Sequence, residues 1–331
     1  MDAGGREHGH AVSELMESRD LARRWQETGT EAELRRRTGS QDDLVSTRVQ
    51  DDRYYTVDRL TLGGMTVWDG HGAILTRLER LLGIRTPCEE LITRAMDRHQ
   101  GHAAWGEAAI TLAGRREQES WTAAETLHAD PDPARRVFGA ELMCQFEIFG
   151  EDVEEEFYVR AVTALVDWSE VETDSAVLAV VPEGLYSFVA PRAEAALLAH
   201  AGHHHAGVRR SVAAGIRRHP DGPHLSDGAR EALLTLLADP DAEVRRSACF
   251  SAAAAGSGDP ALTEVVAVLL DDPERPVQLA ALYGLAMHDD DRCVAAADRW
   301  GGPRRGFGEQ ERGAFESVWW FQRQREDRGR A

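Results

Sequence analysis

A cluster of histidines is the first feature of the chain that could carry chemistry. The stretch HAGHHHAG contains His200 and the consecutive run His203–His205. Imidazole binds transition metals, and it titrates nearer to neutral pH than any other unperturbed side chain. A metal site needs three or more ligands that converge on one point, and adjacent residues seldom do so unaided. We therefore expect a solvated turn without metal or cofactor; metal binding and contact with a partner remain as alternatives.

A second pair, Asp69 and His71 in the stretch VWDGHG, has the residue types of a general acid and base. No nucleophile or third partner lies nearby in the sequence, so we expect a turn anchored by Trp68 rather than a catalytic site. The chain contains no lysine, which excludes Schiff-base catalysis and a phosphate-loop lysine. The sequence thus favours a protein without catalytic residues.

Pairs of adjacent arginines recur along the chain. Guanidinium groups bind carboxylates and phosphates in a forked geometry, so such pairs could form a binding strip for an acidic partner. The alternative is that one arginine of each pair is structural and the other is merely solvated. The pairs at the start of the predicted second helices are Arg135–Arg136, Arg209–Arg210 and Arg245–Arg246. The candidate binding residues are Arg209, Arg210, Arg245, Arg246, Gln278 and Tyr283.

These residues belong to segments that repeat with a period near 36 residues. The turn Asp239-Pro240-Asp241 with the helix after it has copies at 129–142 and 271–286, its Val-Arg-Arg-Ser part recurs at 207–216, and a weaker copy lies at 169–180. Proline disfavours helical geometry in the residue before it, so each unit predicts one helix that ends at the turn and a second, alanine-rich helix after it. A single helix pair cannot bury its own apolar faces, whereas stacked pairs can.

The Asp-Pro turn, the following Val-Arg and the alanine-rich helix resemble the HEAT-repeat (armadillo-like) family over roughly residues 86–300. The resemblance implies an all-α fold, a right-handed α-α superhelix of about six helix pairs. It also implies that each turn aspartate bonds the arginine six positions later, which forms a ladder between repeats. Asp239 and Arg245 have that spacing, whereas Gln278 stands six residues after Asp272. His203 takes the aspartate's place, so we expect a missing or rebuilt rung that leaves Arg209 freer to bind something else.

The segments on either side of the repeats differ from them. Residues 1–85 form a non-repeat segment for which we expect helices and, over 53–72, a hairpin or an ordered loop. The repeats begin at a capping-box signature formed by Thr86, Pro87 and Glu89. Residues 301–331 predict a capping helix and tail. We expect the aromatic side chains of 319–321 to cover the last apolar face.

Charge and composition narrow the functions that the chain can have. Asp and Glu number 57 and the basic residues 38, which gives a formal net charge of −19. Such an acidic chain is an unlikely ligand of nucleic acid or anionic membranes. The four cysteines are scattered without a CxxC pair, no long apolar stretch is present, and the N-terminal residues do not resemble a secretion signal. These features predict a cytoplasmic location.

Two functions follow from the family resemblance. The preferred one is a non-catalytic scaffold or adaptor that binds a protein or peptide on the concave surface of the solenoid. The alternative is a HEAT-like enzyme such as a DNA glycosylase of alkylation repair. The arginine pairs would then line a groove, and Trp105, Trp121 or Trp168 with Asp167 would form the site. The net charge argues against this alternative.

Overall fold

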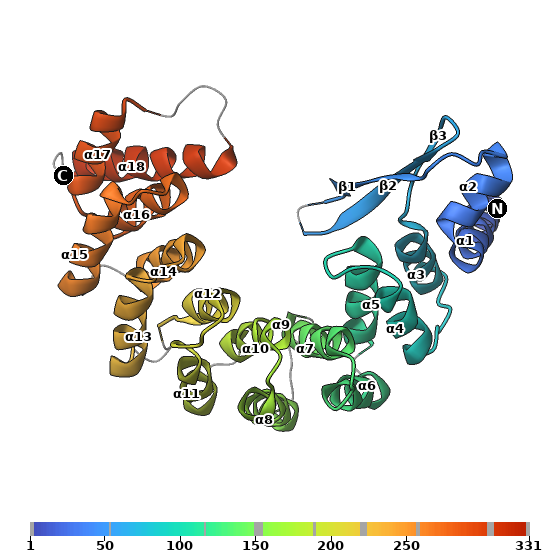
Figure 1. The fold of residues 1–331 in the computed structure, drawn as a ribbon, viewed down its shortest axis with the longest axis horizontal. Helices are drawn as coiled ribbons and strands as arrows, with labels where there is room; N and C mark the ends of the chain where they lie inside the picture. The colour runs from blue at the N-terminus through green and yellow to red at the C-terminus, as the bar shows by residue number, and fades with distance from the viewer. Residues whose placement is uncertain are drawn as a thin grey trace. The chain divides into compact units, whose positions relative to one another are not determined.

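The computed structural model describes residues 3–52, 54–115, 117–148, 155–187, 190–218, 224–255, 259–302 and 308–328 (Figure 1). The chain forms two compact units, Met1–Asp152 and Val153–Ala331. Helices dominate both units, so the expected all-α solenoid is confirmed. None of the helices in the described ranges is long and apolar enough to span a membrane.

The first unit contains a small sheet among its helices. Its elements are α1 (Ala3–Thr28), α2 (Thr30–Thr38), β1 (Val45–Gln50), β2 (Thr56–Leu62), β3 (Met65–Trp68), α3 (His71–Leu81), α4 (Cys88–Met96), α5 (Ala103–Gly114), α6 (Gln118–His128) and α7 (Pro133–Ile148). Helices α4 and α5 pair, as do α6 and α7, and α1, α3, α5 and α7 follow one another as neighbours. The second helix of the first expected pair, residues 103–114, is confirmed residue for residue.

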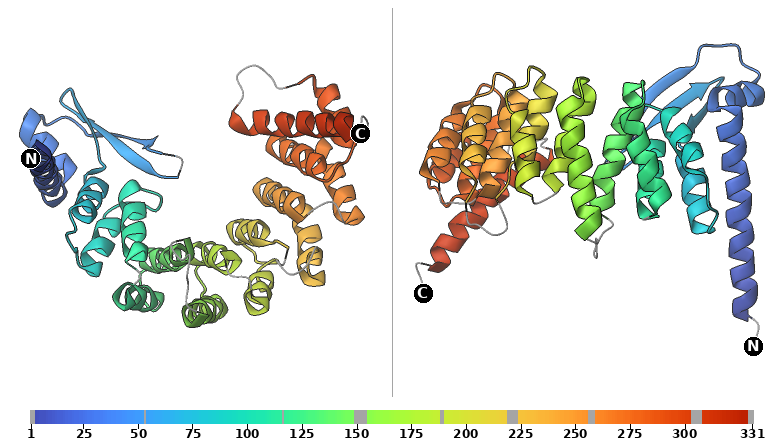
Figure 2. Two further views of the ribbon diagram at one scale, coloured as in Figure 1. Left: turned by 180° about the vertical axis from the view of Figure 1, so that it is seen from behind. Right: turned by 90° about the horizontal axis from the view of Figure 1, so that it is seen from below.

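The sheet is antiparallel, with the strand order β1-β2-β3. It lies at the end of α1 that is farther from the N-terminus (Figure 2). Its inner residues Leu60 and Leu62 pack with Trp25 of α1 and Leu34 of α2, which gives the sheet a core of its own. The hairpin expected over 53–72 is present as β2 and β3, whereas β1 was not predicted; it is short, and all its residues but Val49 are exposed.

A buried carboxylate joins three helices of this unit. Glu79 of α3 accepts from Arg94 of α4 at 2.8 Å and from Arg23 of α1 at 2.7 Å. Thr86 donates to the same carboxylate at 2.7 Å, so the prediction that Thr86 caps α4 is wrong. The residue at the N-cap position is Pro87, without a side-chain cap. A buried charge demands partners, and Glu79 attracts the hydroxyl that the capping signature had assigned to the helix end.

The second unit is helical throughout its described residues. Its elements are α8 (Glu155–Val171), α9 (Ser175–Leu178), α10 (Val181–Ser187), α11 (Pro191–Ala199), α12 (Ala206–Gly215), α13 (Asp227–Leu237), α14 (Ala242–Ala255), α15 (Pro260–Val268), the short 3₁₀ helix η1 (Leu269–Asp271), α16 (Arg275–Met287), α17 (Arg292–Trp300) and α18 (Glu309–Arg328). Helices α10, α12, α14, α16 and α18 follow one another as neighbours, and we call them the second-helix row. Helices α11, α13 and α15 form a second layer that packs against this row (Figure 1).

Small residues allow the helices of the row to approach closely. Gly284 of α16 lies against α14 and α15, where an added Cβ would come within 3.3 Å of Val266 Cγ1 and 3.6 Å of the Cys249 carbonyl. Polar side chains also link successive helices of the row: Ser251 donates to the Ala213 carbonyl at 2.6 Å, and His288 Nε2 lies 2.8 Å from the Ala252 carbonyl. Both carbonyls lie in the last turn of their helices, and the bonds tie successive helices of the row together.

Helix α18 closes the row by packing on α16. Its buried apolar residues are Ala314, Val318 and Phe321. Trp319 and Trp320 are 49% and 55% exposed, so the prediction that they cover the last apolar face holds for Phe321 alone. On a helix, residues three and four apart share a face, and the indole neighbours of Phe321 therefore lie away from α16.

Candidate functional site

Arginines after two of the turns form bidentate ion pairs with the next turn along the second unit. Arg209 donates through Nε to Asp239 Oδ2 at 2.7 Å and through Nη2 to Oδ1 at 2.8 Å. Arg245 makes the same pair of bonds with Asp272, at 2.8 and 2.9 Å. We call each of these pairs a rung. Burial alone would raise the pKa of Asp239, but the bonds from Arg209 and from the Asp241 N–H lower it.

The arginine six residues after the turn aspartate Asp239 does not bond the carboxylate of that aspartate, contrary to what the family resemblance implied. Arg245 Nη1 donates to the backbone carbonyls of Asp239 and Pro240, at 2.8 and 3.1 Å, and not to the Asp239 carboxylate. That carboxylate serves the arginine of the preceding repeat instead. The Arg245 guanidinium thus makes two kinds of bond. Nη1 donates to backbone carbonyls of its own turn, whereas Nε and Nη2 donate to the carboxylate of the next turn.

His203 replaces the turn aspartate without releasing Arg209. His203 Nδ1 accepts from the His205 N–H at 3.2 Å, as Asp239 Oδ1 accepts from the Asp241 N–H at 2.8 Å. Arg209 donates to the His203 carbonyl at 2.8 Å in addition to its rung. The expectation that Arg209 is freer to bind something else is therefore wrong. Its rung depends on Asp239 of the next turn and not on the residue at 203.

The last turn is completed by a different set of residues. Gln278 Nε2 donates to the Asp272 carbonyl at 2.7 Å, so glutamine keeps the main-chain bond of the arginine that it replaces. Arg275 then reaches onward, to Glu311 of α18 at 2.7 Å, with its guanidinium 4.3 Å from the centre of the Trp300 ring. Three of the candidate binding residues, Arg209, Arg245 and Gln278, thus belong to the framework.

The other three candidates, Arg210, Arg246 and Tyr283, lie on the second-helix row outside the rungs. Arg210 of α12 is exposed, and Arg246 of α14 is partly buried. Arg246 pairs with Glu243 at 2.7 Å, and its guanidinium lies 5.9 Å from the centre of the Phe250 ring. Phe250 is 41% exposed, and its ring centre is 5.7 Å from that of Tyr283 on α16. Sequence reasoning missed Phe250, because a phenylalanine in an alanine-rich helix suggests core.

The histidine run forms the turn between α11 and α12, as expected. The rings of His203 and His204 lie 4.3 Å apart, and those of His200 and His203 6.4 Å apart. Burial lowers the pKa of His200, and burial together with the nearby His204 and His200 lowers that of His203. No group of three His, Cys, Asp or Glu side chains in the described part of the chain is placed to hold a metal ion.

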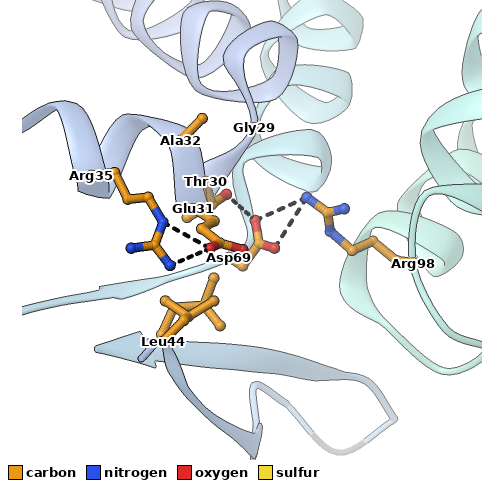
Figure 3. Close-up of a pocket in the computed structure, with 9 residues that line it drawn as sticks. Gly29, Thr30, Glu31, Ala32, Arg35, Leu44, Asp69 and Arg98 are labelled. Atoms are coloured by element: carbon orange, nitrogen blue, oxygen red, sulfur yellow. Dashed lines mark hydrogen bonds and ion pairs between the residues drawn. The ribbon is translucent and has the colours of Figure 1, made fainter. Parts of the chain in front are cut away.

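Asp69 lines a pocket of about 550 Å3 in the first unit (Figure 3), and His71 Nδ1 lies 4.0 Å from Asp69 Oδ1. Asp69 accepts from Thr30 and from Arg98, which lies 3.1 Å from both carboxylate oxygens. Burial alone would raise the pKa of Asp69, but the bonds from His71 and Thr30 and the charge of Arg98 hold it at about 2. A base of that strength is poorly matched to proton transfer near neutral pH.

The anchoring role expected of Trp68 is wrong, because this side chain is half exposed. Trp25 takes that role: its ring stacks on His71 with centres 4.5 Å apart. Arg35, which also lines the pocket, pairs with Glu31 at 2.7 Å, so the charged groups around the pocket are matched within the chain.

The residues suggested for a glycosylase-like site are buried or paired within the chain. Trp105, Trp121 and Trp168 are all buried, and Trp105 Nε1 donates to Glu141. Trp168 lies in the other unit from the first two. Asp167 is exposed and pairs with Arg192 at 2.8 Å. These side chains belong to the core or to surface ion pairs.

Comparison with known proteins supports the fold. No family model matches the chain, and no curated protein matches it significantly. Among solved structures, the chain resembles the YibA protein of Escherichia coli, with a TM-score of 0.51 and 18% identity over 70% of this chain and 81% of that one. It also resembles the Schizosaccharomyces pombe condensin Cnd3–Cnd2 subcomplex, with a TM-score of 0.52 and 14% identity over 76% of this chain and 35% of that one. At such identities the likeness shows the fold alone, which is a solenoid of helical repeats.

Proposed function

We propose that this protein is a HEAT-like scaffold that binds a protein or peptide partner on the exposed face of α12, α14 and α16. The observation that carries the proposal is Phe250, a large apolar side chain that remains accessible on a helix row where most other apolar residues are buried. The rungs support the assignment to a HEAT-like solenoid, because they use the turn aspartates and following arginines by which the sequence resembles that family.

The chemistry of this face indicates the kind of partner. Aromatic residues and arginine dominate the energetics of many protein interfaces. Here Phe250 and Tyr283 offer adjacent ring faces, Arg246 lies over one of them, and Arg210 is exposed on the next helix. A partner that packs an apolar side chain against the exposed Phe250 ring and places a carboxylate near the arginines would match this arrangement.

Solenoids present extended surfaces that suit such partners. One structural neighbour is a subcomplex of two condensin subunits, and a role in assembly is what we propose for this chain. The net charge of −19 supports a protein partner over a nucleic acid, whose phosphates such a chain would repel.

Affinity purification from native cell extract, followed by mass spectrometry, tests the proposal. The wild-type chain is compared with the double variant Phe250→Ala/Arg246→Ala and with the control Val268→Ala on α15. Val268 is 72% exposed and lies outside the second-helix row. We expect one partner that the wild type and the control recover and the double variant loses, with unchanged circular dichroism. Equal recovery by all three chains, or no recovery by any, would refute the proposal.

A further inference from the structure

The outer edge of β1 is open. Strand β1 pairs with β2 along one side and is the first strand of the sheet order, so its other side faces no strand among the described residues. Its residues are exposed except for the half-buried Val49. No backbone hydrogen bond from 45–50 to a described residue outside the sheet was found. A strand in this state presents a row of N–H and C=O groups that can pair with another strand.

This edge carries only one of the usual features that prevent strand addition, the charged side chain of Arg48. Natural edge strands are commonly protected by proline, lysine or a β-bulge. The segment 45–50 contains neither proline nor lysine, and its six residues pair with β2 in uninterrupted register from Val45 to Gln50. Arg48 is its one charged residue. The strand is therefore regular enough to accept a partner over its full length.

Acidic residues at both ends of β1 define which strand it accepts. Asp42 and Asp43 precede the strand, Asp51 and Asp52 follow it, and all four are exposed. Arg53, which lies outside the described residues, comes next in the sequence. A second copy of β1, in either direction, would place its own aspartates against these, and the like charges would repel. A strand with basic residues at both ends would instead find opposite charges.

We propose that the open edge of β1 binds an extended peptide with basic residues at both ends of a segment of about six residues. The peptide adds a fourth strand to the sheet through main-chain hydrogen bonds, and its terminal Arg or Lys side chains lie near the two aspartate pairs. Side chains alternate between the faces of a strand, so the peptide also meets Val45, Thr47 and Val49 on one face. This surface lies in the first unit and is independent of the second-helix row.

Fluorescence anisotropy with labelled peptides tests the proposal on the full chain. The probe is Arg-Arg-Thr-Val-Thr-Val-Thr-Val-Arg-Arg, and one comparison peptide carries Glu in place of every Arg. A second comparison peptide is N-methylated at alternate residues, which removes main-chain donors and leaves the charge unchanged. We expect saturable binding of the probe alone. Equal binding of the N-methylated peptide would overturn strand addition, and equal binding of the acidic peptide would overturn the charge argument.

A charge variant of the protein gives an independent check. The change Asp43→Asn/Asp51→Asn removes one charge at each end of β1 without removing a side-chain bond found among the described residues. We expect it to weaken binding about three- to tenfold. The control Glu17→Gln/Glu231→Gln changes the net charge equally and should bind like the wild type. Equal loss of peptide binding in both variants would overturn the proposal. The proposal would also be overturned if the chain without peptide formed a dimer that the change Thr47→Pro abolishes.

Discussion

Single side chains join adjacent turns of the second unit. In the rung between Arg209 and Asp239 the two side chains are 13% and 6% exposed, so removing one charge leaves the other poorly solvated. Asp239→Asn keeps an oxygen that can accept from the Asp241 N–H but loses the charge. We expect it to lower the free energy of unfolding by about 2–4 kcal/mol, measured by urea denaturation.

The matched control for this prediction is Glu243→Gln. It makes the same chemical change in the ion pair with Arg246, where the Glu243 side chain is 49% exposed. An exposed pair contributes little, so we expect a loss below about 1 kcal/mol. Losses of equal size in the two variants would show that the rung contributes no more than a surface contact.

His203 gives the turn between α11 and α12 a dependence on pH closer to neutrality than that of its aspartate counterparts, which stay ionised there. Its Nδ1 accepts a bond, so this ring must be neutral, and burial with the nearby His204 and His200 lowers its pKa. When the folded pKa lies below the unfolded value of 6.5, the unfolded chain takes up the proton first as pH falls. The stability contributed by the neutral ring is therefore complete above pH 6.5 and is lost below it.

The variant His203→Asp tests this origin of the pH dependence. A carboxylate at 203 stays ionised between pH 7.5 and 5.5 and accepts the same turn bond, so we expect thermal stability to fall less over this range than in the wild type. Burial also lowers the pKa of His200, so the variant should keep part of the pH dependence of stability. The control His224→Asp should keep the wild-type slope; an unchanged slope in His203→Asp would assign the effect to other groups.

At the scale of elements, the last helix stabilises the second unit through one face. Phe321 of α18 is buried, whereas its neighbour Trp320 is 55% exposed. We expect Phe321→Ala to cost about 3–5 kcal/mol in urea denaturation, because it leaves a cavity at the last layer of the row. Trp320→Ala, in the same helix turn, should cost less than about 1 kcal/mol. The reverse order would show that the indoles, and not Phe321, cap the solenoid.

Helix pairs could be predicted from the sequence because their signals are local. Apolar periodicity and the Asp-Pro turns mark each pair within about 36 residues, and α5 matches its expected range. The partners of the turn side chains could not be predicted in the same way, since Asp239 meets Arg209 from 30 residues earlier. Phe250 was missed because exposure depends on the neighbouring helices, and β1 because a strand needs β2 beside it to be recognised.

At the scale of the whole molecule, the two units carry the two proposed binding surfaces separately. Each unit buries apolar side chains among its own helices, and in repeat proteins stability comes from contacts between neighbouring repeats. We therefore expect fragments 1–148 and 155–331 to fold alone, with helical circular dichroism and cooperative melting. The second fragment should retain the Phe250-dependent partner, and the first should bind the basic-ended peptide. If both fragments fold but each function needs the intact chain, the surfaces are not confined to the units to which we assign them. If a fragment fails to fold, its core depends on the other unit.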